Sequence, residues 1–497
     1  MAERHAVLAL DQGGHASRAC VVDSEGLILA EAQREVRTRH GPDGAPGGAV
    51  EHDAEELAAS LWTAARAALA QARAGFAQLR VESAGLATQR STIVCFRRGD
   101  GAPLSPAISW QDRRNAAWLA QFAPQAARVR RITGLPLSPH YGVAKLRWCL
   151  DELEPVRQAR QSGELQIGPL AAYLVARLTG RPGGVDPANA ARTLLWDSAT
   201  QDWSAELLEL FGVPRALLPP CLRTRAEFGR LNPPGPDPSG EPREIITLRA
   251  VSGDQSAVPF AFGAPDVRSV YVNLGTGAIL QRPVARRPVD PRPLLGGVLA
   301  VDERVAWYCL EGTVNGAGSA ISAFCTASRC PQDVFWPALE QLAPEAPLPI
   351  YINGIGGLGS PYWRPEQHSY FVGEGTLLER FAAVLESITF LIASNFDSLA
   401  RWGGRPERVL LSGGLSSSDW LCQRLAACLG VPLLRTAREA TALGIAALAA
   451  ERRLYMDEPA LPLEALQRFE PEALGTRDRE ALAARRARFD ALLREQR

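Results

Sequence analysis

Three short glycine turns, each placed where a predicted strand ends, carry groups that could bind phosphate. They are Asp11-Gln12-Gly13-Gly14, Gly275-Thr276-Gly277 and Ser412-Gly413-Gly414. Glycine lacks a Cβ atom, so its backbone N–H group can approach an anion closely. The third turn precedes a predicted helix that begins near Ser418, and a helix N-terminus favours anions. A single turn of this kind is more often a hairpin connection, but three of them, spread over both halves of the chain, favour a phosphate or nucleotide ligand.

Two acidic residues stand beside such turns. Asp11 ends the first predicted strand, and Asp254 follows another predicted strand in Val251-Ser252-Gly253-Asp254-Gln255. A carboxylate next to a phosphate-binding turn can hold Mg²⁺ directly or through water, or it can accept a proton from a hydroxyl nucleophile. The alternative is an aspartate that only caps the N–H groups of its own turn. Without further context that structural interpretation is the more common one.

The composition restricts the remaining functions. The 497 residues carry 54 Lys+Arg and 54 Asp+Glu, so the formal net charge is zero, whereas a nucleic-acid-binding protein needs a basic surplus or stripe. No apolar run approaches the ~20 residues of a membrane span. The nine cysteines include no Cys-x-x-Cys pair, and the six histidines show no metal-ligand spacing. The sequence therefore predicts a cytoplasmic protein without nucleic-acid or membrane partners. Lys145 is the only lysine, so phosphate contacts must come mostly from arginine, backbone amides or a metal.

The elements that must position these groups alternate between strands and helices, which is typical of an α/β fold. Strands are predicted first at 6–10, 19–23, 27–30, 81–87 and 92–96. A stretch rich in glycine and proline at 231–240 interrupts the pattern, which then restarts with a strand at 270–274. Because each half opens with strands around a small glycine turn, we expect two similar domains at 1–249 and 250–497, with the ligands in the cleft between them.

The order of the short motifs resembles that of the FGGY carbohydrate kinase family, and within it the glycerol kinases most closely. The matching segments run from about residue 6 to about residue 450. They are Asp11-Gln12-Gly13 with Ser17-Arg18, Val50-Glu51-His52-Asp53, Thr88-Gln89-Arg90, Ser109-Trp110-Gln111, 186–193, Gly253-Asp254-Gln255, Gly275-Thr276-Gly277, Glu311-Gly312 with Gly318, 356–363, Leu385-Glu386-Ser387-Ile388 and Thr441-Ala442-Leu443-Gly444. Each motif is short, but their common order is not expected by chance.

The resemblance implies two actin-like (ribonuclease H-like) ATPase domains, with a sugar or polyol acceptor on the first and ATP mainly on the second. It implies that Asp254 is the base that deprotonates the acceptor hydroxyl, and that Asp11 and Asp254 hold Mg²⁺. The implied acceptor contacts are Arg90, Ser91, Trp110, His140, Asp254 and Gln255. The implied nucleotide contacts are Gly13, Gly14, His15, Arg18, Gly275, Thr276, Gly318, Ser322, Gly413, Gly414 and Ser418.

Departures from the glycerol kinases concentrate in the first phosphate turn and in the acceptor site. Where those enzymes carry paired threonines, this chain has Gly14-His15-Ala16, and His15 could donate in place of the missing hydroxyls. Ser91 stands where they have Glu, and His140 stands where they have Tyr. The shorter, neutral Ser91 creates room. The chain is therefore predicted to be an ATP- and Mg²⁺-dependent kinase of a larger polyol or of a pentose or ketose-type sugar.

Two alternatives stay open at this point. The first is a glycerol kinase with an unusual acceptor lining. The second is a non-catalytic nucleotide-binding regulator with the same fold, which the altered turn at Gly14-His15-Ala16 supports, although the intact Asp11 and Asp254 favour an enzyme. The C-terminal segment 477–497 has apolar residues at helical spacing and is expected to be a docked amphipathic helix, with a homodimer contact as the minority interpretation.

Overall fold

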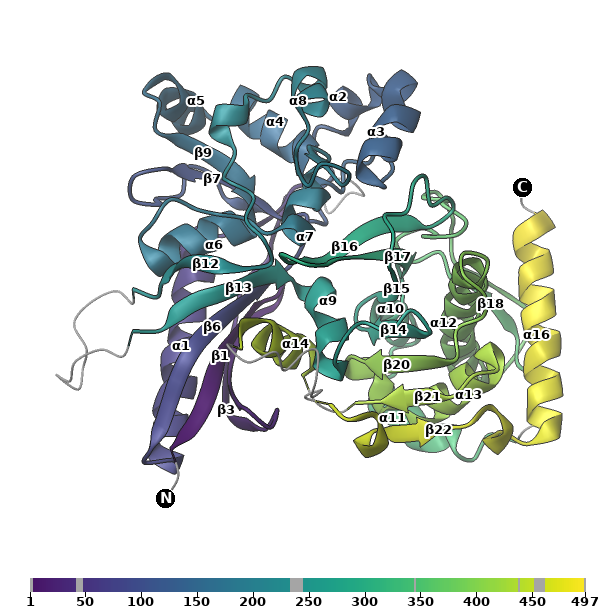
Figure 1. The fold of residues 1–497 in the computed structure, drawn as a ribbon. Helices are drawn as coiled ribbons and strands as arrows, with labels where there is room; N and C mark the ends of the chain where they lie inside the picture. The colour runs from purple at the N-terminus through teal and green to yellow at the C-terminus, as the bar shows by residue number, and fades with distance from the viewer. Residues whose placement is uncertain are drawn as a thin grey trace.

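The computed structural model describes residues 3–41, 48–232, 245–343, 346–436, 439–450 and 461–495 (Figure 1). Two mixed sheets, one from each half of the chain, form the body of the molecule. The predicted interruption at 231–240 lies outside the described residues from 233 onward. The described helices include none that is long and apolar enough to cross a membrane.

The first sheet has the order β12-β13-β6-β1-β2-β3. Its strands are β1 (Arg4–Gln12), β2 (Ala16–Asp23), β3 (Ile28–Glu35), β6 (Leu79–Thr88), β12 (Arg225–Arg230) and β13 (Thr247–Gly253). The first three form an antiparallel meander, and β6 and β13 run parallel to β1. Alternate residues of β1 serve two cores, because Leu8 and Leu10 pack with helix α1 (Ala54–Gly75) and Val7 and Ala9 pack on the other face.

The second sheet repeats this scheme in the order β16-β17-β15-β14-β20-β21-β22. Its strands are β14 (Ser269–Leu274), β15 (Ala278–Val284), β16 (Leu295–Val301), β17 (Ala306–Val314), β20 (Arg408–Ser412), β21 (Leu433–Arg435) and β22 (Gln467–Phe469). Again an antiparallel meander of β14, β15 and β17 is followed by parallel strands, here β20 and β21. The predicted repetition of the two halves is therefore confirmed in strand order and direction.

A smaller sheet in the first half has the order β4-β5-β8-β7-β9. Its strands are β4 (Arg39–His40), β5 (Val50–His52), β7 (Ile93–Arg97), β8 (Ala107–Ile108) and β9 (Leu165–Pro169). The helices and short strands around it are α2 (Ala116–Ala120), α3 (Ala126–Thr133), α4 (Gly142–Glu152), α5 (Glu154–Gln161), α6 (Leu170–Thr179), α7 (Pro187–Ala190), β10 (Trp196–Asp197), β11 (Asp202–Trp203) and α8 (Ala205–Phe211). This layer carries the loops that contain residues 91, 110 and 140.

The second domain is completed by helices around its sheet. They are α10 (Gly318–Ser328), α11 (Gln332–Leu339), α12 (Leu377–Ala400), α13 (Asp419–Leu429) and α16 (Thr476–Glu495), with a hairpin of β18 (Ile350–Ile352) and β19 (Tyr370–Val372). The C-terminal helix α16 docks against this domain through buried Leu482, Phe489 and Leu493, as the spacing predicts. The guanidinium of Arg485 also donates to both oxygens of the buried Glu386, at 2.6 Å each. The predicted homodimer contact stays a prediction.

Helix α14 (Ala440–Ala449) joins the two domains. It belongs to the second half of the chain but packs against β1, β6 and β13 of the first sheet (Figure 1). A Cβ atom at Gly444 would overlap the carbonyl oxygen of Ala257, and one at Gly85 would stand 2.6 Å from the carbonyl oxygen of Ile445. These two glycines therefore allow a backbone approach that no other residue permits. Through Ala257, α14 lies directly against the short helix α9 (Asp254–Ala257).

The predicted domain boundary between residues 249 and 250 falls inside β13. Since β13 pairs with β6, residue 250 belongs to the first sheet by its hydrogen bonding. The chain continues through α9 and the 3-10 helix at Val258–Phe262 before β14 begins the second sheet. We propose a boundary between residues 263 and 268 instead.

Candidate active site

The carboxyl ends of β1, β6 and β13 meet at one edge of the first sheet. The parallel register aligns Gln12 with Thr88 and Thr88 with Gly253. Asp11 therefore lies beside the residues that follow β6 and β13, which are Gln89-Arg90-Ser91 and Asp254-Gln255. In open α/β sheets, the crevice outside such strand ends is where ligands bind. The structure thus brings together the predicted metal, base and acceptor residues of the first domain.

Asp254 opens α9 and lies next to an arginine. Its Oδ1 accepts a hydrogen bond from the N–H of Gln255 at 2.7 Å, and Nε of Arg90 lies 3.8 Å from the same oxygen. A Cβ atom at Gly253 would stand 2.6 Å from Cγ and Cδ of Arg90, so the glycine lets the arginine cross the backbone there. Burial raises the pKa of Asp254, and the charge of Arg90 offsets part of that effect. Such a carboxylate can take up a proton from a neighbouring hydroxyl.

Asp11 holds a carboxylate oxygen without a donor. Its Oδ1 is buried and has no hydrogen-bond partner in the described parts of the chain. The pKa of Asp11 is raised from 3.8 to about 7, mainly by burial and then by the charge of Asp254, while the charge of Arg18 opposes both effects. A buried carboxylate oxygen in need of a partner suits a hard cation such as Mg²⁺. The described residues contain no cluster of three His, Cys, Asp or Glu side chains that could hold a metal, so phosphate oxygens and water would have to complete the coordination.

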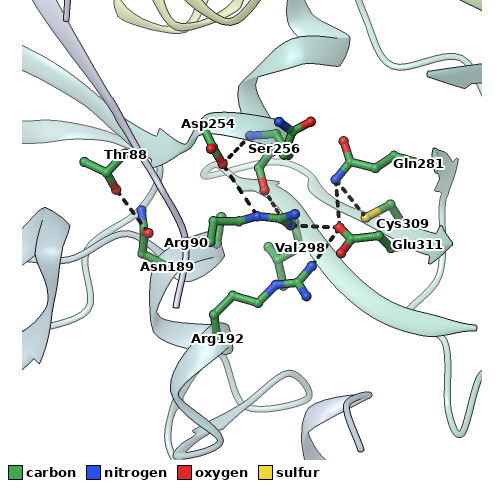
Figure 2. A network of polar contacts seen from close by, with 12 residues as sticks. Thr88, Arg90, Asn189, Arg192, Asp254, Ser256, Gln281, Val298, Cys309 and Glu311 are labelled. Atoms are coloured by element: carbon green, nitrogen blue, oxygen red, sulfur yellow. Dashed lines mark hydrogen bonds and ion pairs between the residues drawn. The ribbon is translucent and has the colours of Figure 1, made fainter. Parts of the chain in front are cut away.

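A buried ion network fixes Arg90 from the opposite domain (Figure 2). Glu311 of β17 accepts hydrogen bonds from Arg90 and Arg192 at 2.8 Å each and from Gln281 at 3.2 Å. The Glu311 side chain is only 2% exposed. Burial opposes its ionisation, yet the charges of Arg192 and Arg90 hold the pKa of Glu311 down at about 2. Glu311 is therefore ionised at neutral pH and connects the second sheet to Arg90, a predicted acceptor contact.

The proposed acceptor residues lie on neighbouring loops of the first domain. The Ser91 Oγ atom is buried and finds no hydrogen-bond partner among the described residues, and neither side-chain polar atom of Gln89 does. The Trp110 and His140 rings meet edge to face, with centroids 5.6 Å apart, and the Trp110 side chain is 38% exposed. Burial holds the pKa of His140 well below its ordinary value, so its ring is neutral near pH 7.

In the second domain, the glycine turns at Gly275 and Gly413 lie together at the end of β14, as the acidic residues of the first domain lie together at the ends of its strands. The N–H groups of Ala317 and Gly318 donate to the carbonyl oxygens of Thr276 and Gly275 at 2.9 and 3.0 Å. This contact places the N-terminus of α10 against the turn between β14 and β15. Gly413 has a φ of 97° and passes so close to Leu274 that a Cβ atom would overlap its carbonyl oxygen. Three predicted nucleotide residues, Gly275, Gly318 and Gly413, are therefore in one place.

The remaining predicted nucleotide residues differ in their surroundings. A Cβ atom added at Gly414 would meet nothing within 4 Å in the described structure, as expected for backbone that faces a ligand. Ser418 is the N-cap of α13, where its Oγ accepts from the N–H of Leu421 at 3.3 Å. Ser322 is exposed on α10, and His15 is exposed in the first turn. Arg18 pairs with Glu439. The phosphate or nucleotide contacts of these four side chains stay predictions, as do those of Gly13 and Gly14.

The sequence did not assign five residues of this region to the site, namely Gln89, Lys145, Arg192, Gln281 and Glu311. Arg192 and Glu311 lie in segments that match the family, but the sequence does not show that they meet. One usable signal is that Glu311 is a single acid within the apolar strand Tyr308-Cys309-Leu310-Glu311. A charge at such a position is almost never buried unless it is paired.

The two sheets have the same strand order, and α14 joins them. Acidic residues and glycine turns lie at the ends of their strands. This arrangement is that of a two-domain actin-like phosphotransferase. The model for the N-terminal domain of the FGGY family of carbohydrate kinases matches residues 6–261, and the model for the C-terminal domain matches residues 270–451. The chain belongs to this family. It is therefore an ATP-dependent phosphotransferase that acts on a hydroxyl group of a small carbohydrate or polyol.

Curated relatives and solved structures agree on the family and the fold. The glycerol kinase of Methylibium petroleiphilum is 35% identical over 513 residues, covering 98% of this chain and 99% of that enzyme. Glycerol kinase 1 of Pseudomonas aeruginosa is 33% identical and covers 90% of each chain. The Plasmodium falciparum glycerol kinase with ADP has a TM-score of 0.83 at 20% identity, with 97% of each chain covered. A xylulose kinase from Brucella ovis has a TM-score of 0.84 at 22% identity, with 98% of each covered.

We expect Glu311→Gln to lower the free energy of unfolding by about 3–5 kcal/mol, because two buried guanidinium groups lose their counter-charge. The control is Glu303→Gln, since Glu303 pairs with Arg223 at 2.6 Å but is 72% exposed; a pair of this kind contributes about 1 kcal/mol or less. Urea unfolding of both variants measures the difference. Equal losses in the two variants would contradict the importance of the network.

The pKa of Asp11 predicts a pH dependence of stability in the absence of metal. An acid whose pKa rises from 3.8 to about 7 on folding holds its proton more tightly in the folded protein, so its contribution to the free energy of unfolding falls as the pH rises through this range. The Asp11→Asn variant has no ionisable group at this position, so its free energy of unfolding does not fall with pH for this reason. In a chelator, the variant should melt at a higher temperature than the wild type near pH 8, and the two should converge below about pH 4. A constant difference across this range would contradict the shifted pKa.

Proposed function

We propose that this kinase transfers the γ-phosphoryl group of ATP to a hydroxyl of a polyol or sugar larger than glycerol, with Mg²⁺ held at Asp11 and Asp254. The observation that carries the proposal is the pair of carboxylates, Asp11 and Asp254, where three parallel strands end. Asp254 lies beside an arginine, whereas the Oδ1 atom of Asp11 accepts no hydrogen bond from any described residue. One group can therefore accept a proton, and the other can accept a cation.

Each residue then has a defined task in the transfer. Asp254 accepts the proton of the acceptor hydroxyl at a carboxylate oxygen, and Arg90, held by Glu311, orients the acceptor next to it. Bound Mg²⁺ at Asp11 would neutralise charge on the phosphate groups. The open backbone at Gly414 and the turn of Gly275 and Thr276 would bind the nucleotide. Phosphoryl transfer depends on such positioning and charge stabilisation and requires no covalent intermediate with the protein.

The acceptor size follows from the polar groups that lack partners. Ser91 is shorter than a glutamate and carries no charge, so it leaves space, and its buried Oγ still needs a hydrogen bond. His140 presents a neutral ring that can both donate and accept. A site that requires additional hydroxyl groups discriminates against a smaller analogue, because the buried groups of the site would remain unpaired. We therefore infer a polyol or ketose of four or five carbons.

Glycerol is the second candidate, and the relatives support it. The curated relatives named above are glycerol kinases at 33–35% identity over most of the chain. Arg90, Trp110 and Gln255, which match glycerol kinase segments, are also present. A non-catalytic regulator is not supported, because the chain belongs to a family of kinases and Asp254 is in place beside Arg90.

Asp254→Asn should reduce kcat by at least ~10²-fold, because asparagine has a similar shape but cannot accept the hydroxyl proton. The affinity for ATP, measured by titration calorimetry, should change little. Asp202→Asn is a suitable control, since the Asp202 side chain is 58% exposed and pairs with Arg215 at 3.3 Å. Turnover of Asp254→Asn at the wild-type rate would remove Asp254 from the role of base.

A competition among glycerol, erythritol, xylitol, ribulose and xylulose tests the acceptor. We expect an acceptor of four or five carbons to have the highest kcat/KM. Ser91→Glu should shift the preference toward glycerol, whereas the control Ser91→Ala, which adds no charge, should not. If glycerol gives the highest kcat/KM with the wild type, the inference from the pocket is wrong. If Ser91→Glu leaves the order unchanged, Ser91 does not determine specificity.

A further inference from the structure

Lys145 occupies an unusual position for a lysine. It is the only lysine among the 54 basic Lys and Arg residues of the chain, and it is completely buried in α4. Its Nζ atom donates to three backbone carbonyl oxygens, those of Ser91 at 2.8 Å, Ser109 at 3.0 Å and His140 at 2.8 Å. A lysine is almost never fully buried without such partners.

The three carbonyl groups belong to three separate loops of the acceptor site. Ser91 and His140 are themselves proposed acceptor residues, and Ser109 directly precedes Trp110. Two further features connect the same loops. The N–H of Trp110 donates to Oγ1 of Thr92 at 3.1 Å, and the Trp110 and His140 rings are in contact. Ser91 has a φ of 64°, a backbone conformation that is unfavourable for a serine. Its hydrogen bond to Lys145 helps to stabilise that conformation.

The chemistry of the contact explains why an ammonium group is present where the rest of the chain uses arginine. An ammonium has three N–H donors around one small centre, whereas a guanidinium is a flat, wider fork. Three carbonyl oxygens that converge on one point therefore fit an ammonium group and not a guanidinium group. Burial lowers the pKa of Lys145 to about 7, with the charge of Asp112 acting in the opposite direction. The three acceptors favour the charged form, since only that form has a proton for each of them.

We propose that Lys145 is a positioning residue of the acceptor site, whose ammonium group holds the loops of Ser91, Trp110 and His140 in one arrangement. This inference rests on the proposed function, because it takes these three residues to line the acceptor site. Lys145 is not a catalytic residue, since its Nζ is covered and bonded to backbone. Its effect reaches the acceptor through the loops, and a displacement of ~1 Å in such a loop can reduce turnover by ~10²-fold.

Steady-state kinetics of Lys145→Met tests the proposal. The KM of the acceptor should rise at least ~10-fold, whereas the KM of ATP should change less than ~2-fold. The matched control is Arg282→Met, because Arg282 is also buried and donates to the carbonyl oxygens of Leu399, Gly403 and Gly404, but in the second domain. It should lower the melting temperature without changing the KM of the acceptor. Equal effects of the two variants on both KM values would overturn a specific role for Lys145.

The wild-type protein allows a second measurement that does not depend on how the variant folds. Because the chain has one lysine, labelling with ¹⁵N-lysine gives a single side-chain resonance in the NMR spectrum. We expect an ammonium signal whose protons exchange slowly, and we expect it to shift when xylitol or glycerol binds without nucleotide. A rapidly exchanging signal, or one that does not move at saturation with both compounds, would overturn the proposal.

Two further variants separate this proposal from the proposed function. If Ser91→Ala and His140→Ala change the KM of the acceptor but Lys145→Met does not, the acceptor site stands and the role of Lys145 is wrong. If none of the three changes it, the acceptor site has been placed wrongly and both proposals fail. If all three change it and Arg282→Met does not, both are supported. Should Lys145→Met not fold, the lysine resonance of the wild type decides.

Discussion

The buried contact of Glu311 with Arg90 and Arg192 is the interaction on which the site depends, because it crosses between the domains. Glu311 comes from the second sheet, and both arginines come from the first domain. Arg90 in turn lies 3.8 Å from Asp254, so the surroundings of the proposed base are determined by a carboxylate on the other sheet. A shift of one domain relative to the other would have to move or break this contact. The acceptor site is therefore sensitive to the interdomain geometry, which ligand binding in a cleft can alter.

Symmetry between the sheets explains why the remaining groups lie at equivalent strand ends in the two domains. In each domain a meander of three strands precedes two parallel strands, and the carboxyl ends of parallel strands lie together. In the first domain these ends carry Asp11 and Asp254, and in the second they carry the turns at Gly275 and Gly413. Helix α14 lies unusually close to α9 and to β6, because Gly444 and Gly85 have no side chain. Under the proposed function, the same fold would supply proton and metal chemistry at the strand ends of one domain and backbone amides at those of the other.

The sequence predicted those parts of the site that depend on local structure. A strand, a turn rich in glycine and an adjacent acid can be recognised within a few residues, which is why Asp11, Asp254 and the turn at Gly275 could be predicted as site residues. It could not predict that Lys145 reaches Ser91, Ser109 and His140, because three loops separated along the chain must meet first. The boundary at residue 250 was placed inside β13 for a related reason, since only pairing with β6 shows which sheet a strand joins. Neither the length nor the composition of the segment contains that information.

The contrast between Glu311 and Asp11 shows how the structure divides its acidic residues between two tasks. Burial opposes ionisation of both. Glu311 meets two guanidinium groups and has a pKa of about 2, so it stays charged and cannot take part in proton transfer at neutral pH. Asp11 meets the negative charge of Asp254 and has a pKa of about 7. The Oδ1 atom of Asp11, which accepts no hydrogen bond from the described residues, and the repulsion of Asp11 by Asp254 both favour a cation bound at Asp11. In the proposed function, a divalent ion held at Asp11 would supply positive charge near Asp254 and would favour its ionised form, which must be present before the acceptor hydroxyl can lose its proton.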